Sequence, residues 1–561
     1  MKDDLHVRQR RRNRPPSAAA LALLALLVAL LAVRVVTVSR AQNIARDGCL
    51  YLQMARDFST LSAGEVTRSY EYHPAYSAVI AGGANLLGMS WPDGWIQVGR
   101  GVSIGFSLVG LLAVYLVARR AFDARIAWVS VLIAGLSSAF MEVSCDVISD
   151  AMAVSLAAMG IALGLEARHA IGRGSVWSLA LSAGAALTSA GAYLTRPEGL
   201  LAAGIAAILL LRIPTTASRR STRKLQLASL GLLVGLTVAC CLPYMLAVGG
   251  LTMKKGFSDF VAGSAGSLPL ASANVPADLL SALRRAVDRL RSAAGTPMAV
   301  LCIACLATWA GRYWLRLKLP ERVVITPREG SAMVAVFGPL TVLFPLLVAL
   351  EFSLGSPEDG YISSRHMLPA ALLLSPLAGA AVAILVQWSL HLGRRAGLVE
   401  RPRLAWICWT LGVTCILAIR AVPVLHADKQ VHIHTGQAIA EQFGPGCRVL
   451  APNAWVPFFA QADRRQFMQV GGPQCTLRPH HLQDRAALEK LLEGDRTDAP
   501  TLIAVTTNLL ESSARPDRTL ERLQGDPMLE LLRNFRASDG DRIWLFRWRT
   551  PSSTETQPSR P

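Results

Sequence analysis

Long apolar segments recur along most of this chain, and they restrict its fold more than any other feature. They begin at residue 17 and end near residue 425, and charged residues, Pro or Gly bound each one. A helix needs about 20 apolar residues to cross a lipid bilayer, and these segments are close to that length. The chain is 52% hydrophobic and 17% charged, with a mean hydropathy of +0.37. These values are typical of a polytopic membrane protein.

The basic residues indicate how the segments are oriented. The formal net charge is +19, but Arg and Lys lie in short clusters between apolar segments. This pattern does not fit a nucleic-acid-binding face, whereas short loops rich in Arg and Lys mark the cytoplasmic ends of membrane helices. We expect about eleven transmembrane helices in the cell (inner) membrane, with an uncleaved first helix, a cytoplasmic N-terminus and an outer C-terminal end. The predicted spans are 17–38, 97–117, 127–141, 148–165, 176–194, 200–211, 225–248, 297–314, 332–350, 367–390 and 406–424.

The sequence divides into a membrane part and a smaller soluble part. A basic segment (1–16) precedes the membrane domain (17–425), which carries large outer loops at 39–96 and 249–296. Residues 47–55 and 75–87 predict two surface helices in the first loop, and 278–291 has amphipathic spacing in the second. Residues 426–550 predict a small extracytoplasmic α/β domain with strands at 447–451, 501–505 and 542–548 and a helix at 484–492. The tail, 551–561, is rich in Ser, Thr and Pro and is predicted to be disordered.

The ten cysteines do not form a zinc-binding pattern. The only Cys-x-x-Cys pair, Cys302 and Cys305, lies inside an apolar segment, where both residues are expected to pack. Cys447 and Cys475 are the only cysteines of the soluble domain. A disulfide between them fits an oxidising compartment, but sequence alone does not set their distance.

Several polar residues fall at the predicted outer ends of the spans. They are Asp47, His73, Asp146, Asp150, Arg196, Glu198, Arg365 and His366. Ionisable groups close to lipid are costly, so each is a candidate functional residue. Each also has a structural alternative: acids suit helix N-termini, and Arg196-Pro197-Glu198 fits a salt-bridged turn at a helix start. Asp57 is expected to be a charge on the surface of the helix that contains Asp47.

Five short motifs occur in order along the outer face. They are Asp47-Gly48-x-x-Tyr51-x-x-x-Ala55, His73-Pro74-x-Tyr76, Ser149-Asp150, Leu194-Thr195-Arg196-Pro197-Glu198-Gly199 and Ser364-Arg365-His366-x-Leu368-Pro369. Together they resemble the polyprenol-phosphate-sugar-dependent glycosyltransferases of the GT-C superfamily. The likeness is greatest to the bacterial branch related to protein O-mannosyltransferases, aminoarabinose transferases and rhizobial core galacturonosyltransferases. It covers roughly residues 17–425.

The resemblance implies a role for each site residue. Asp47 matches the catalytic base, Asp150 a second acid, and Arg196 and Arg365 the positions near the donor phosphate. Tyr51, His73, Glu198 and His366 are expected to contact substrate. The chain departs from its relatives where Gly48 replaces a second acid and where His366 replaces a common Tyr.

The residue types suit an inverting sugar transfer. A carboxylate can take the proton of the attacking hydroxyl, and arginine can bind the departing phosphate through paired hydrogen bonds. The implied donor is a sugar on undecaprenyl phosphate or a related polyprenol carrier, and the acceptor is a lipid, a glycan or a protein. No cofactor follows from the sequence, and a divalent metal is compatible with it but not indicated.

Two other functions fit a chain with many spans. A transporter or flippase of a lipid-linked or small solute also needs charge in the membrane, but such proteins tend to show repeated halves and midplane charges. This chain has no evident repeat, and its charges gather at one predicted face. A non-catalytic scaffold that presents the soluble domain leaves that set of residues unexplained.

Overall fold

The chain folds into two compact units in a computed structural model. The described residues are 18–212, 220–253, 275–313, 327, 330–354, 363–396, 401–421, 424–470, 476–493, 500–513, 515–537 and 540–549. The helical unit consists of Met1–Ser39, Gly101–Cys145 and Ser149–Pro423. The α/β unit consists of Arg40–Arg100, Asp146–Ile148 and Val424–Pro561. The basic N-terminal segment, the tail and Cys475 lie outside the described residues.

Seven of the described helices are long and apolar enough to cross a membrane. They are α2 (Ala18–Arg40), α6 (Asp93–Ala121), α9 (Ser149–Gly172), α12 (Arg220–Val248), α16 (Gly330–Leu354), α17 (Leu368–Arg395) and α18 (Pro402–Ala421). Two bent pairs raise the number to nine if each is one span: α7 (Ala124–Leu136) with α8 (Ser138–Ser144), and α14 (Val275–Ala294) with α15 (Thr296–Tyr313). The protein is therefore a multi-pass helical membrane protein, as predicted.

The eleven predicted spans all fall on helices, but not all of these helices have full spanning length. The bend between α7 and α8 is 64°, and the bend between α14 and α15 is 108°. The helices α10 (Trp177–Tyr193) and α11 (Leu200–Leu211) have 17 and 12 residues. The predicted amphipathic segment 278–291 lies within α14. Bends and short helices therefore explain why helix length alone gives fewer membrane spans than the eleven that the sequence pattern predicts.

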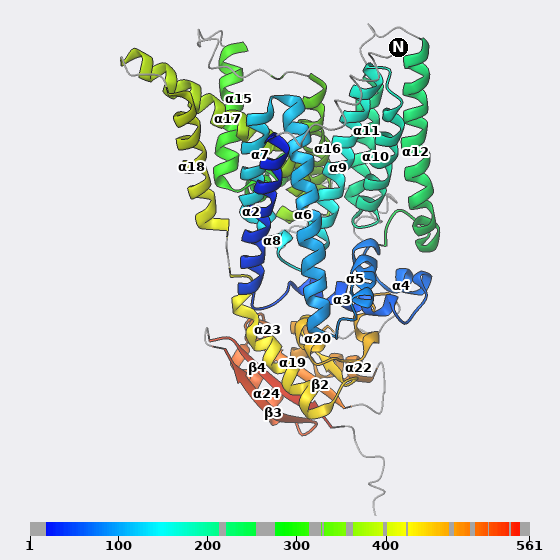
Figure 1. The fold of residues 1–561 in the computed structure, drawn as a ribbon. Coiled ribbons are helices and arrows are strands. Elements are labelled where there is room, and N and C mark those ends of the chain that lie inside the picture. The colour runs from blue at the N-terminus through cyan, green and yellow to red at the C-terminus, as the bar shows by residue number, and fades with distance from the viewer. Residues whose placement is uncertain are drawn as a thin grey trace, which may run out of the picture. The chain divides into compact units, whose positions relative to one another are not determined.

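The centre of the helical unit is formed by α9 and α17, which are buried over most of their length. Figure 1 shows α9, α10 and α11 side by side, and α9 also packs against α16 and α17. Small residues allow these close contacts. A Cβ at Gly164 of α9 would lie 2.7 Å from Cβ of Ala206 in α11. The hydrophobic effect contributes little to the association of helices within lipid, so membrane helices rely on small residues to pack closely.

The α/β unit contains a four-stranded mixed sheet in the order β1-β2-β4-β3. The strands are β1 (Arg448–Leu450), β2 (Thr501–Thr506), β3 (Leu529–Arg536) and β4 (Arg542–Trp548). β1 pairs with β2 in parallel, and β4 runs antiparallel to both β2 and β3. The three predicted strands are confirmed. The sequence did not predict β3, because half of its side chains are exposed and three of its residues are charged.

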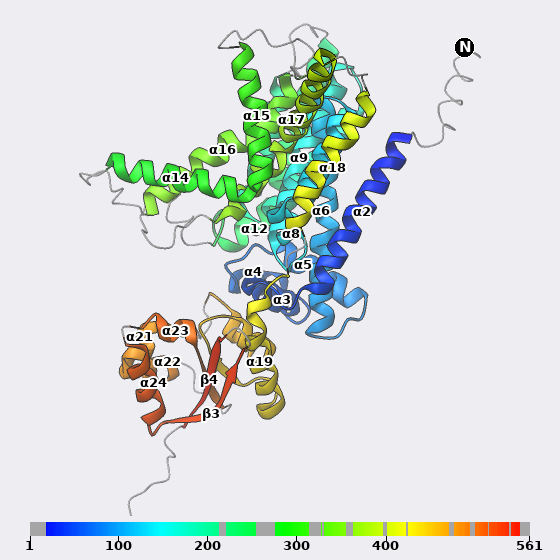
Figure 2. The ribbon, with the colours of Figure 1, turned by 90° about the vertical axis from the view of Figure 1, so that its left-hand side faces the viewer.

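Both faces of this sheet are covered, as the alternating burial of β2 shows. Ile503 and Val505 pack with α22 (Arg485–Glu493) and α24 (Pro516–Gly525). Leu502 and Ala504 pack on the other side with α19 (Gln430–Phe443). Figure 2 shows α19 on one side of β3 and β4 and α22 and α24 on the other. The remaining short helices here are α20 (Trp455–Phe459), α21 (Pro479–Gln483) and α23 (Thr507–Glu511).

The first predicted outer loop belongs to the α/β unit. It forms α3 (Arg46–Phe58), α4 (Ala63–Ser69) and α5 (Ala75–Leu86), so its two predicted helices are confirmed. Trp455 Nε1 donates a hydrogen bond to the Ile44 carbonyl at 2.8 Å, and the Gln469 and Val470 amides donate to the Ser69 carbonyl. These bonds join the loop to the C-terminal segment. Cys447 is buried in this unit, and burial raises the pKa of its thiol to about 11.

Candidate active site

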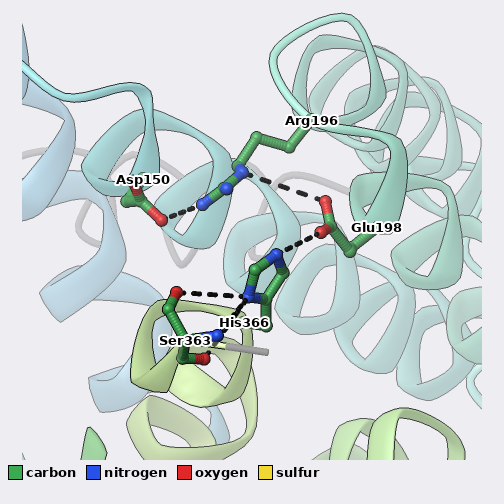
Figure 3. A network of polar contacts seen from close by, with 5 residues as sticks. All are labelled: Asp150, Arg196, Glu198, Ser363 and His366. Carbon is green, nitrogen blue, oxygen red and sulfur yellow. Dashed lines mark hydrogen bonds and ion pairs between the residues drawn. The ribbon is translucent and has the colours of Figure 1, made fainter. Parts of the chain in front are cut away.

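A network of charged side chains joins three distant segments of the helical unit (Figure 3). Arg196 contacts the carboxylate of Asp150 through Nη1, and its Nε lies 3.9 Å from Glu198 Oε2. Nε2 of His366 lies 3.5 Å from Glu198 Oε1. Asp150 lies in the first turn of α9, and only 2% of its side chain is exposed, compared with 15% for Arg196. A carboxylate this deeply buried requires such a partner.

The turn that carries Arg196 and Glu198 has a local sequence reason. The chain leaves α10 through an extended Arg196, whose amide donates to the Ala192 carbonyl at 2.8 Å. Pro197 then opens the 3-10 helix η1 (Pro197–Gly199), because its fixed φ suits a first helical position. A Cβ on Gly199 would overlap the backbone between Ala192 and Tyr193. The predicted salt-bridged turn is therefore present, and its glycine is required by close packing.

His366 lies in the 3-10 helix η4 (Ser364–Met367). Ser363, the residue just before this helix, holds the His366 ring in place. The Ser363 amide donates to His366 Nδ1 at 3.2 Å, and the Ser363 hydroxyl lies 3.2 Å from the same nitrogen. With Nδ1 accepting, a neutral ring carries its proton on Nε2, facing Glu198. His366 thus positions Glu198. Ser363 was missed by the sequence reasoning, although it immediately precedes the motif that contains Arg365.

A narrow cavity of about 30 Å³ lies beside this network in the helical unit. Arg196, Glu198, Arg365 and His366 line its polar part. The rest is apolar, with walls from α9, α11, α16 and α17 that include Ala157, Ile161, Ile205, Leu343 and Leu373. Two guanidinium groups next to an apolar wall can bind an anionic head group that carries a hydrocarbon chain.

Asp47 lies in the α/β unit, in the first turn of α3. Its side chain is 28% exposed, and the Nε of Arg46 lies 3.7 Å from its Oδ1. The neighbouring Gly48 packs directly on another segment, since a Cβ there would lie 2.7 Å from the Val147 carbonyl oxygen. A second acid at position 48 therefore has no room here. Only one acid stands at the start of α3.

Asp146 organises the backbone that leads to Asp47. It is 1% exposed, and its Oδ1 accepts hydrogen bonds from the amides of Ala45 at 3.0 Å and Val147 at 2.7 Å. Its Oδ2 lies 2.7 Å from Nε2 of His426. Asp146 thus fixes the residue before α3 and the segment against which Gly48 packs. Sequence reasoning placed Asp146 on the same face but gave no indication of His426, which follows the last predicted span.

Tyr51 and His73 are both buried in the α/β unit. The Tyr51 ring packs against Tyr72 and Tyr76, with ring centroids 4.7 and 5.2 Å apart. His73 is 1% exposed. Their contact with substrate stays a prediction.

The expectation for Asp57 is wrong. Its side chain is not a surface charge but is buried, and the Tyr70 hydroxyl donates to its Oδ2 at 2.8 Å. Burial raises the pKa of Asp57, and the hydrogen bond from Tyr70 opposes that change. The cause is a long-range contact, because Tyr70 reaches Asp57 from beyond α4.

The structure groups the candidate residues in two sets. The helical unit brings together Asp150, Arg196, Glu198, Arg365 and His366. The α/β unit contains Asp47, Tyr51, His73 and Asp146. Over the described part of the chain, no three His, Cys, Asp or Glu side chains cluster as metal ligands would.

Comparisons with known proteins identify the class of this fold. The profile of the dolichyl-phosphate-mannose-protein mannosyltransferase family matches residues 74–244. Structures of ArnT from Cupriavidus metallidurans, apo and bound to undecaprenyl phosphate, are each 15% identical with a TM-score of 0.56 and align over 94% of this chain and 98% of theirs. The oligosaccharyltransferase AglB from Archaeoglobus fulgidus, in complex with an inhibitory peptide and a dolichol-phosphate, is 13% identical with a TM-score of 0.51, over 86% of this chain and 69% of that one. No curated protein sequence matches the chain significantly.

The matched fold is that of multi-pass membrane enzymes that transfer sugars. More specifically, this chain has the fold of the GT-C glycosyltransferase superfamily, which confirms the resemblance drawn from its five motifs.

Proposed function

We propose that the protein is an inverting glycosyltransferase that moves a sugar from a polyprenyl-phosphate carrier to an acceptor on the outer face of the cytoplasmic membrane. The observation that carries the proposal is the cavity of the helical unit, where Arg196 and Arg365 stand beside an apolar wall. A polyprenyl phosphate has the same two chemical parts. The ArnT structure with undecaprenyl phosphate and the AglB structure with a dolichol-phosphate, both with the same fold, support this choice of donor.

The proposed roles follow the chemistry of the transfer. Arg196 and Arg365 bind the donor phosphate and stabilise its charge as the bond between the anomeric carbon and the phosphate oxygen breaks. Asp150 and Glu198 hold Arg196 in place, and His366 holds Glu198. We expect Arg196 to exchange part of its contact with Asp150 for the phosphate.

Asp47 is proposed as the general base, on the strength of its motif and its partly exposed position in the first turn of α3. It takes the proton of the acceptor hydroxyl as that oxygen attacks the anomeric carbon, so the configuration inverts and polyprenyl phosphate leaves. Asp146 acts as a positioning residue, because it holds the backbone just before α3. We propose that both the α/β unit and the acceptor lie outside the cytoplasm and that the N-terminus lies inside.

The test is sugar transfer by the full-length protein in proteoliposomes, supplied with labelled undecaprenyl-phosphate sugars and an envelope extract as acceptor. Asp47→Asn is expected to lower kcat by about 10²- to 10⁴-fold, the usual contribution of a general base. Asp93→Asn is the matched control, because Asp93 is an exposed acid in the first turn of α6, which begins at the end of the same predicted loop. Full activity of Asp47→Asn would overturn the assignment of the base.

A second arm tests the donor site. Arg196→Gln and Arg365→Gln should raise KM for the donor at least tenfold, whereas Arg173→Gln, an exposed arginine of the same unit, should leave it unchanged. Vesicle uptake of a lipid-linked solute without any transfer would instead identify a transporter.

A further inference from the structure

A second cavity, of about 380 Å³, lies within the α/β unit and plays no part in the roles proposed above. We call it the α3 cavity. Arg56, Asp57 and Thr60, at the end of α3 and just beyond it, line one side. Gln461, Asp463 and Arg464, which follow α20, line the other. α20 packs on α3, and the cavity is within the range of small-ligand sites, about 300–1,000 Å³.

Two arginines give the α3 cavity a positive character. The Arg56 guanidinium lies over the Trp91 ring, 4.9 Å from its centroid. Arg464 donates through Nη1 to the Thr60 hydroxyl at 3.3 Å. Within the described residues, neither arginine forms an ion pair with a carboxylate. Both side chains are exposed to solvent and can therefore bind an anion without first breaking a salt bridge.

The two acids of the cavity already have partners. Tyr70 donates to Asp57, and Asp463 accepts from the side chain of Arg465 at 3.0 Å. Two arginines, Arg56 and Arg464, thus line the cavity, and one of its two acids, Asp463, is already paired with Arg465 outside the lining. Thr60 and Gln461 add groups that can bind sugar hydroxyls. This combination suits a sugar that carries an anionic group.

The backbone on the far side of the cavity is braced. Gln461 adopts a left-handed conformation with φ of 49°, and its carbonyl accepts from the Gly446 amide at 2.9 Å. The Asp463 amide donates to the Cys447 carbonyl at 3.2 Å, and the Asp463 side chain accepts from the Arg465 amide. The polar groups are therefore held in place before a ligand arrives, which lowers the entropic cost of binding.

We propose that the α3 cavity binds a saccharide that carries a phosphate or a carboxylate, and that this saccharide is part of the acceptor. The acceptor role rests on the proposed glycosyltransferase function, whereas the binding itself does not. Arg56 and Arg464 bind the anionic group, and Thr60 and Gln461 bind hydroxyls. The α3 cavity would thereby select anionic glycans over neutral ones.

Saturation-transfer NMR titrations on the full-length protein in nanodiscs test the proposal, with glucose 1-phosphate, glucuronate and glucose as probes. At least one anionic probe should bind tenfold or more tightly than glucose, and the better probe tells phosphate from carboxylate. The double variant that carries both Arg56→Gln and Arg464→Gln should bind the anionic probe at least tenfold more weakly. Arg536→Gln, at an exposed arginine of β3 in the same unit, should bind as the wild type does. The two single variants replace the double variant if its melting temperature falls.

Three results would overturn the binding site: equal affinity for glucose and both anions, no binding of either anion, or unchanged affinity in the arginine variants. Undecaprenyl phosphate binding, measured on the same samples, should be the same in wild type and in the double variant. Anionic sugar binding without transfer from any donor would overturn the proposed function and the acceptor role but would confirm the cavity as a saccharide site.

Discussion

Two groups of arginines in this protein differ in how their charge is held. In the helical unit, Arg196 is 15% exposed, contacts two carboxylates and lines a cavity of about 30 Å³. In the α/β unit, Arg56 and Arg464 are exposed and line a cavity of about 380 Å³. A buried guanidinium needs carboxylate partners to offset lost hydration, whereas an exposed one does not. The first set therefore combines structural and ligand-binding roles, and the second is available to a ligand alone.

The largest expected effect is on the stability of the helical unit. Arg196→Gln leaves Asp150 buried without its cation, which should cost about 3–5 kcal/mol. Arg464→Gln should change stability by less than about 0.5 kcal/mol, as is usual at exposed positions. Thermal unfolding of the purified protein in detergent measures both. Adding Asp150→Asn to Arg196→Gln should recover part of the loss, and equal melting temperatures for Arg196→Gln and Arg464→Gln would remove the distinction between the two groups.

A second prediction concerns the turn that carries Arg196. Gly199→Ala should destabilise the protein by about 1–3 kcal/mol, because the new methyl group overlaps the end of α10. Gly204→Ala is the control: nothing lies within 4 Å of a Cβ there, and alanine favours the helix. If the two variants unfold at the same temperature, close packing does not hold this turn.

A smaller effect is expected at the other end of the network. Ser363→Ala removes the hydroxyl that caps η4 next to His366 Nδ1. This change should lower the free energy of unfolding by about 1 kcal/mol. Ser364→Ala, one residue further, should have less effect. Donor KM is the second readout, because a looser His366 should weaken the hold on Glu198; an unchanged KM would limit Ser363 to a capping role.

The smallest prediction concerns Asp57 and pH. Burial raises its folded pKa above the ordinary value of 3.8, so the folded state binds its proton more tightly than the unfolded state does. The stability from this group is greatest below that value and falls as pH rises through the folded pKa. Asp57→Asn lacks this decline, so melting temperatures across about pH 3 to 6 should fall less in the variant than in the wild type. Tyr70→Phe, which removes the opposing hydrogen bond, should move the decline to higher pH; parallel profiles for all three proteins would contradict the assignment.

The sequence predicted the elements of this fold better than their partners. Apolar segments of near-membrane length placed all eleven spans on helices, because burial in lipid depends on local composition. The motif around Arg196 also predicted a salt-bridged turn, since Pro197 and Glu198 are its neighbours. The contact of Arg196 with Asp150 joins residues 46 positions apart, and spacing in the sequence contains no measure of such a distance.

Asp57 and His426 show why the remaining contacts could not be predicted. The pattern of α3 alone does not show that Tyr70, 13 residues away, covers Asp57. His426 meets Asp146 across 280 residues, and nothing around it indicates a site. Strand β3 was missed for a related reason: its alternation is weak, and it depends on β4 for its place in the sheet.

Gly48 limits how this chain could change its chemistry. A neighbouring acid beside Asp47 would be one route to a two-carboxylate metal site, but any side chain at position 48 meets the Val147 carbonyl. Residues 146–148 are in turn held by the hydrogen bonds of Asp146. A metal-dependent descendant would therefore have to shift residues 146–148 before it could tolerate an acid at position 48. A single substitution is not enough to place two acids side by side here.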